Sequence, residues 1–257
     1  MTDALHAEWT KLRTVTSSAW ILLTLAALTV AAGSLAADVV KCPASCSVDP
    51  TKISLTGVIL GQAAAAGLAV MVMAGEYSTG LVRTTLAATP RRGVVLAAKA
   101  AVLTACIGAA GLAGVLGSVL AGHLLLPGNG YTAARGFAAV SLLHGPTLRA
   151  AAGSVLYLIL IGLLSLGLGA ALRSATATAA ATLGLLYVLT FIGDIGLNAT
   201  WQHRIERWTP MDAGLAVQAT THLARQPIAP WPGLGVCALW AAAALAGGWL
   251  VLRLRDA

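Results

Sequence analysis

The sequence predicts an all-α integral membrane protein with six transmembrane helices and both termini in the cytoplasm. Hydrophobic residues make up 58% of the 257 residues and charged residues only 10%, whereas soluble domains average about 25% charged residues. The mean hydropathy of +0.84 excludes a disordered chain, which combines low apolar content with high charge. Six apolar stretches approach or exceed the ~20 residues that a spanning helix needs. An ordinary soluble enzyme is therefore excluded.

The six predicted spans belong to one transmembrane domain that covers residues 1–257, and each should be helical because lipid offers no partners for backbone polar groups. They are 19–37, 53–74, 93–126, 150–172, 177–197 and 232–252. The third span has 34 residues and would measure about 51 Å against a hydrocarbon core of about 30 Å. We therefore expect it to protrude from the membrane, with Lys99 near the inner headgroups.

Basic residues predict the orientation of the spans. The chain has 16 Lys and Arg against 9 Asp and Glu, for a net charge of +7, but the basic residues are scattered rather than clustered on one face as nucleic-acid binding requires. Nine of them fall on the side that carries the N-terminus, mostly in short segments, where the positive-inside rule applies. The expected contact is the lipid bilayer and not nucleic acid.

Residues 1–18 predict an amphipathic helix that lies in the inner membrane interface. Leu5, Trp9 and Leu12 share one helical face, and Glu8 and Lys11 lie beside it, a pattern suited to the boundary between headgroups and acyl chains. A frayed tail is the alternative. A cleaved signal peptide ending near residue 36 is a further alternative, but the 19-residue apolar run is longer than the ~7–15 residues usual in such peptides.

Small residues recur at helix-packing intervals in several spans, as in Gly57 with Gly61 and Gly111 with Gly114. Such positions let helix backbones approach closely in a membrane. They predict packing within the bundle first, and a moving or dimer contact second.

The sequence contains none of the catalytic motifs that the following spacings would reveal. None of its lysines follows a Gly as a phosphate-binding P-loop requires, and no two His residues have the i, i+4 spacing of a zinc helix. We therefore expect no catalytic residue, no metal site and no cofactor in this chain. Gln62 is the main polar residue deep in a span, and the lack of a midplane carboxylate disfavours an ion-coupled carrier. The residues that would bind a substrate are not identified.

Two of the four cysteines lie in the first outer loop. Cys42 and Cys46 are the first and last residues of a five-residue polar segment, and an oxidising outer face permits a disulfide between them. A bridge and a reduced pair remain equally open, and a bridge would make the loop rigid.

The segment that connects the second and third spans is the most informative part of the sequence. Ser78 or Thr79 can cap a short helix, and Pro90 would end it before the third span begins. The segment predicts a short, charged, rigid helix on the cytoplasmic side.

Here the sequence resembles the permease subunits of type-two ATP-binding-cassette (ABC) exporters. Those proteins share an ordered pattern in the same place. It consists of a Glu, a Gly four residues later, an Arg three residues after the Gly and a Leu three residues after the Arg. A Pro-Arg-Arg sequence follows shortly, and a Lys comes early in the third span. The matching residues are Glu76, Gly80, Arg83, Leu86, Pro90, Arg91 and Lys99. The N-terminal helix with Glu8 and Lys11 and the six-span count also fit.

The resemblance implies a half-transporter of the bacterial plasma membrane. Two such permease subunits, identical or different, would pair with two cytoplasmic ABC ATPase subunits, which would bind the ATP and Mg. The segment from Glu76 to Arg91 would be the coupling helix that contacts the ATPase, with the N-terminal helix beside it. The expected cargo is hydrophobic, lipid-like, drug-like or a peptide. A membrane assembly or regulatory subunit without transport is the alternative, and an intramembrane enzyme is the third possibility.

Overall fold

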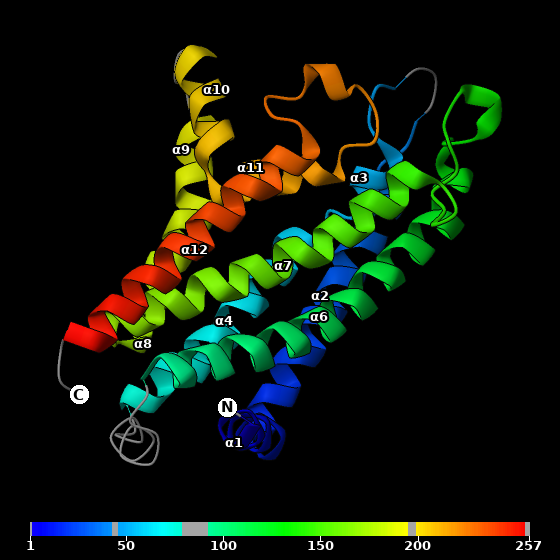
Figure 1. Cartoon of the computed structure of the whole chain (residues 1–257). Helices are drawn as coiled ribbons and strands as arrows, with labels where there is room; N and C mark the ends of the chain where they lie inside the picture. Colours follow the sequence, from blue (N-terminus) through cyan, green and yellow to red (C-terminus); the bar gives the residue numbers. More distant parts are fainter. Residues whose placement is uncertain (1, 43–45, 79–91, 195–198, 255–257) are drawn as a thin grey trace.

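The computed structural model describes residues 2–42, 46–78, 92–194 and 199–254, and the described residues form helices and no strands (Figure 1). Six helices are long and apolar enough to cross a membrane, which confirms the predicted all-α class and the number of candidate spans. Five of them are α2 (Thr16–Val39), α4 (Val58–Ser78), α6 (Arg92–Leu125), α7 (Gly145–Leu172) and α12 (Pro230–Leu254). The remaining one is composite and runs from α8 (Ala175–Leu183) through the π-helical segment η3 (Gly184–Val188) into α9 (Leu189–Asp194).

Shorter helices lie at the two ends of the bundle. At one end, helix α1 (Thr2–Thr14) lies near the end of α4, the start of α6 and the end of α12, and we call this the α1 end (Figure 1). At the opposite end, the α3 end, lie α3 (Pro50–Ser54), α10 (Ala199–Trp208) and α11 (Pro210–Leu215). Four 3-10 turns complete the description: η1 (Pro127–Asn129), η2 (Ala133–Arg135), η4 (Ala216–Gln218) and η5 (Leu223–Arg225).

Helix α7 lies at the centre of the bundle and packs against α4, α6, α8 and α12, while α2 packs against α4 and α6. Close approach depends on glycine at several crossings. A Cβ at Gly57 would overlap the carbonyl oxygen of Thr29 in α2, and a Cβ at Gly167 would overlap the backbone of α12 at Ala244. These contacts agree with the packing role predicted for the small residues, because a methyl group at either place would push two helices apart.

The second predicted span is not one continuous helix. The structure places α3 over Pro50–Ser54, a turn over residues 55–57 and only then α4. Asp49 caps α3, because its carboxylate accepts hydrogen bonds from the backbone N–H groups of Thr51 and Lys52. The turn that follows carries Gly57 against α2, so the break lets two helices approach closely at that point.

The charged segment 201–231 could form a solvated loop or an external lid by sequence, but in the structure part of it packs against the bundle. Helix α11 and turn η4 bury their apolar side chains, among them Ala213 and Val217, which are fully buried. A Cβ at Gly214 would overlap the ring of Tyr157 in α7, and Gly233 of α12 lies against the carbonyl of Ala213. Helix α11 and turn η4 are therefore part of the bundle, whereas Trp208 and Leu223 of the same segment are exposed.

Candidate functional site

Four charged side chains meet at the α1 end and form the ion-pair cluster. It consists of Glu8 and Lys11 from α1, Glu76 from the last turns of α4, and Lys99 from the second and third turns of α6. The two carboxylates and two ammonium groups balance in charge. Glu8, Glu76 and Lys99 are buried, and charges of this kind are tolerated inside a protein when they are paired.

Lys99 is the centre of the cluster and is 1% exposed. Its Nζ atom donates to Glu8 Oε2 at 2.8 Å, to Glu76 Oε1 at 2.6 Å and to the carbonyl oxygen of Val72 at 3.3 Å. An ammonium group has three N–H donors, so these three acceptors satisfy it completely. The contacts join α6 to both α1 and α4.

Lys11 closes the cluster on its exposed side. Its Nζ atom lies 3.0 Å from Glu8 Oε1 and 2.9 Å from Glu76 Oε1. Partial burial by itself lowers the pKa of Lys11, but hydrogen bonds and charge attraction from Glu76 and Glu8 outweigh it, so the net effect raises the pKa above the ordinary lysine value. Lys11 therefore stays charged at neutral pH and keeps both carboxylates paired.

Helix α1 packs on the bundle through Glu8 and leaves Trp9 on its outer side. The sequence predicts that the stripe of Leu5, Trp9 and Leu12 faces the acyl chains, and in the structure Trp9 is 47% exposed while Glu8 is buried. Leu5 and Leu12 are partly buried, and Leu12 packs against the core. The helix has turned toward the bundle because Glu8 pairs with Lys99, a partner 91 positions away, and this leaves the indole of Trp9 on the outside.

Helix α1 covers Lys99, and the charge of this lysine is satisfied inside the protein. Lys99 lies about two turns after the start of α6 at Arg92, and its location near the inner headgroups stays a prediction.

Most of the residues that resemble the coupling helix of ABC exporters lie outside the described residues. These are Gly80, Arg83, Leu86, Pro90 and Arg91. The structure does describe both attachment points of that segment, because α4 ends at Ser78 and α6 begins at Arg92. The ion-pair cluster lies next to both, since Glu76 comes two residues before the end of α4 and Lys99 two turns into α6.

Arginines at the same end of the bundle bind the C-terminal carbonyls of α12. Arg92 Nη1 donates to the carbonyl oxygen of Leu252 at 2.5 Å, and Arg173 Nη2 donates to that of Val251 at 3.3 Å. The last carbonyls of a helix lack intrahelical partners and carry partial negative charge, so cations are favourable there. Arg173 also lies over the ring of Tyr77, with Cζ 5.7 Å from the ring centroid. Sequence reasoning alone does not identify these partners.

A second polar group lies inside the bundle around Gln62, which is fully buried. Its side-chain oxygen accepts a hydrogen bond from the hydroxyl of Tyr157 in α7, and its Nε2 donates to the sulfur of Met211 in α11 at 3.3 Å. Tyr187 in η3 donates to the carbonyl oxygen of Ile59. Gln62 therefore joins three segments that are far apart in the sequence, and its partners explain how a polar residue is accommodated deep in a span.

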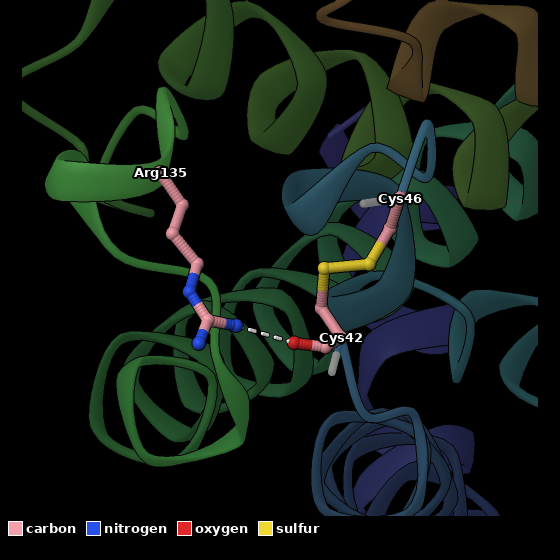
Figure 2. Close-up of a disulfide and its surroundings, with 3 residues drawn as sticks. All are labelled: Cys42, Cys46 and Arg135. Atoms are coloured by element: carbon pink, nitrogen blue, oxygen red, sulfur yellow. Dashed lines mark hydrogen bonds between the residues drawn. A yellow bond between two sulfur atoms is a disulfide. The ribbon is translucent and has the colours of Figure 1, made fainter. Parts of the chain in front are cut away.

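The first outer loop is held by covalent and polar contacts. A disulfide joins Cys42 and Cys46, and the guanidinium group of Arg135 donates to the carbonyl oxygen of Cys42 at 2.6 Å (Figure 2). The backbone N–H of Cys42 donates to the carbonyl oxygen of Asn129 at 2.9 Å. These contacts attach the loop after α2 to the segment that follows α6.

The described part of the chain contains no group of three or more His, Cys, Asp or Glu side chains that could hold a metal ion. Comparison with models of known protein families found no match, and comparison with curated proteins found none either.

Proposed function

We propose that this chain is the permease subunit of an ATP-driven ABC exporter in a bacterial plasma membrane. In this proposal the α1 end faces the cytoplasm, and residues 79–91 contact a separate ATPase subunit that binds ATP and Mg. The chain is not an enzyme by itself, and a second permease subunit, identical or different, completes the pathway. The resemblance of the residues from Glu76 to Lys99 to the family pattern is the sequence support.

The ion-pair cluster is the structural observation that carries the proposal. A force applied to residues 79–91 reaches the bundle through the end of α4 and the start of α6. Lys99 holds Glu76 of α4 at 2.6 Å and Glu8 of α1 at 2.8 Å, so the two attachment points and the interface helix move together. A buried, fully paired charge cluster resists separation because removing one partner leaves an uncompensated buried charge.

The arginine contacts extend the same unit toward α12. Arg92, the first residue of α6, binds Leu252, and Arg173 at the end of α7 binds Val251. Four of the spans are thus joined near the proposed ATPase contact. A displacement of the segment between α4 and α6 would reach the central helix α7 and helix α12 as well as its own flanking helices.

The test uses the full chain purified from native membranes with its associated proteins and reconstituted in vesicles. We expect an ATPase subunit to co-purify and ATP to drive movement of a fluorescent phospholipid or a labelled amphipathic peptide. The variant Lys99→Met should keep ATP hydrolysis within about twofold and lower ATP-driven movement at least tenfold, which is about 1.4 kcal/mol of coupling. Lys41→Met, an exposed lysine at the other end, is the control and should change neither.

Different results would redirect the proposal. Movement of the probes that persists when ATP hydrolysis is blocked would contradict an ATP-driven permease. An ATPase that co-purifies without any ATP-dependent movement would instead support the membrane assembly or regulatory subunit. Catalysis by the purified chain alone would support neither.

A further inference from the structure

A cavity of about 310 Å³ lies at the α3 end, between α3, the first turn of α4, α10, α11 and the segment before α12. Three charged side chains line it: Lys52, Glu206 and Asp212. Its apolar lining includes Ile59, Met211 and Leu215. A concave, partly apolar site with a few polar groups is the usual form of a small-molecule site, and the volume is near the lower end of the usual ~300–1,000 Å³.

The charges of the cavity come from different elements. Lys52 belongs to α3, which follows the first outer loop, whereas Glu206 and Asp212 belong to α10 and α11. The cavity thus brings one ammonium group and two carboxylates together from segments about 150 residues apart in the chain. A zwitterionic ligand can contact both kinds of charge, with its positive group toward the carboxylates and its negative group toward Lys52.

Hydrogen bonds fix both charged sides of the cavity. On the acidic side, Asp212 Oδ2 accepts from the hydroxyl of Thr209 at 2.7 Å and from that of Thr190 at 3.0 Å. On the basic side, Asp49 caps α3 and accepts from the hydroxyl of Thr220 at 2.7 Å and from the backbone N–H of Thr221 at 2.9 Å. The cavity is therefore shaped before a ligand arrives, which lowers the ordering cost of binding.

The apolar lining is attached to the polar group around Gln62. Met211 accepts from Gln62 Nε2 at 3.3 Å, and the backbone carbonyl of Ile59 accepts from Tyr187. Ile59 and Gln62 both belong to α4, whose other end carries Glu76 of the ion-pair cluster. One helix, about 30 Å long at 1.5 Å per residue, therefore connects the cavity to the cluster.

We propose that this cavity binds the zwitterionic headgroup of an amphiphile. The ammonium group of the ligand lies against Glu206 and Asp212, its anionic group lies against Lys52, and the first methylenes of its tail contact Ile59, Met211 and Leu215. The volume holds a headgroup, so the rest of the tail lies outside the cavity. The inference rests on the proposed function only in calling this ligand a cargo, because binding itself needs no ATPase.

The experiment measures binding to the purified full chain in detergent, without ATP or an ATPase. Three probes with the same tail length separate the charges: lysophosphatidylethanolamine, lysophosphatidylglycerol and a long-chain alkylamine. We expect the zwitterion to bind at least tenfold more tightly than the purely anionic or purely cationic probe. Free phosphoethanolamine, which has the same headgroup without a tail, should bind more weakly than the lysolipid.

Charge-neutralising variants then locate the site. Lys52→Gln, Glu206→Gln and Asp212→Asn should each weaken binding of the zwitterion about tenfold. Lys52→Gln should also abolish the preference over the alkylamine. Asp38→Asn and Lys41→Gln remove exposed charges at the same end that do not line the cavity, and these controls should bind as the unchanged chain does. Asp212→Asn keeps an oxygen that can accept from both threonines, so it tests charge rather than folding.

Several outcomes would overturn this inference. Equal affinity of the chain for the two lysolipids and the alkylamine would exclude a charge-selective site in this cavity. Unchanged affinity for the zwitterion in all three cavity variants would exclude it as well. Phosphoethanolamine binding as tightly as the lysolipid would assign the cavity to a soluble zwitterion instead of an amphiphile. Binding as expected, together with a failure of ATP-driven movement, would leave this site in place and remove only the proposed transport.

Discussion

Lys99 is accommodated inside the protein because each of its three donors has an acceptor. Two of these acceptors, Glu8 Oε2 and Glu76 Oε1, are charged and lie at 2.8 and 2.6 Å, and the third is a backbone carbonyl. The side chain is 1% exposed, so water cannot replace a missing partner. The cost of an unpaired charge at this position is correspondingly high.

Replacement of Lys99 by methionine should lower the free energy of unfolding by about 3–5 kcal/mol, since it removes the ammonium group that pairs with both buried carboxylates. The double variant Lys99→Met/Glu76→Gln restores charge balance and should recover part of that loss. Denaturant unfolding of the detergent-solubilised chain measures both. The exposed control Lys41→Met should stay within about 0.5 kcal/mol of the unchanged chain. A double variant less stable than Lys99→Met would contradict charge balance as the reason.

Lys11 gives the cluster a pH dependence with a defined sign. Its pKa is raised in the folded chain, so the stability that it contributes is complete below the ordinary lysine value of about 10.4 and is lost as the pH rises through the folded-state value. The difference in unfolding free energy between the unchanged chain and Lys11→Met should therefore stay constant from about pH 7 to pH 9. It should shrink above about pH 10.5. A difference that falls between pH 7 and pH 9 would show that Lys11 is not held in its charged form.

Helix α4 connects the features that matter most for function. It begins beside the cavity at the α3 end, carries Gln62 through the bundle and ends with Glu76 in the ion-pair cluster. The turn before it, residues 55–57, brings Gly57 against the backbone of α2 at Thr29. The position of α4 along α2 depends on this contact, because the small residue lets the two backbones meet.

Gly57→Ala should destabilise the chain by about 1–3 kcal/mol, the usual cost of overpacking, because the new Cβ would meet the carbonyl of Thr29 and lie 2.8 Å from the backbone nitrogen of Gly33. Gly67→Ala in the middle of α4 is the matched control, since a Cβ there meets no atom within 4 Å. It should be neutral or stabilise by up to about 1 kcal/mol through helix propensity. Thermal unfolding compares the two, and equal effects would mean that the crossing at Gly57 is not tight.

An even number of spans places the N-terminus and the C-terminus on the same side of a membrane. The structure has six candidate spans, and Figure 1 shows α1 and the end of α12 at one end of the bundle. The excess of Lys and Arg in short segments on that side predicts that it faces the cytoplasm. The disulfide between Cys42 and Cys46 lies between α2 and α3, at the opposite end, where an oxidising environment suits it.

Single cysteines should report this orientation. Leu143 is 96% exposed at the α3 end and Asp3 is exposed at the α1 end. In intact cells a membrane-impermeant thiol reagent should label Leu143→Cys and leave Asp3→Cys unlabelled until the membrane is permeabilised. Cys106 and Cys237 lie within spanning helices, and the unchanged chain measures their background. The reverse labelling pattern would place the ion-pair cluster outside the cell and contradict contact with a cytoplasmic ATPase.

The sequence by itself determined that this chain is helical, that it has six candidate spans and that its small residues pack helices together. Length and hydropathy are sufficient for this, because a bilayer leaves a backbone few ways to satisfy its hydrogen bonds. The resemblance to ABC exporter permeases also singled out Glu76 and Lys99, and separately Glu8 and Lys11 in the N-terminal helix, but it did not bring the four together. Periodicity marked the stripe with Trp9 on α1 but did not show that Glu8 packs against Lys99, since a helical stripe records spacing and not the identity of the partner.

Only the tertiary structure decided which charges meet and where a ligand could bind. Lys99 pairs with Glu8 across 91 positions, and the cavity combines Lys52 with Asp212 across 160. Such pairs depend on how helices cross, which is set by many small contacts such as that of Gly57 with Thr29. Local sequence carries the length and polarity of each helix, whereas the free energy of a buried charge depends on neighbours that only the folded chain supplies.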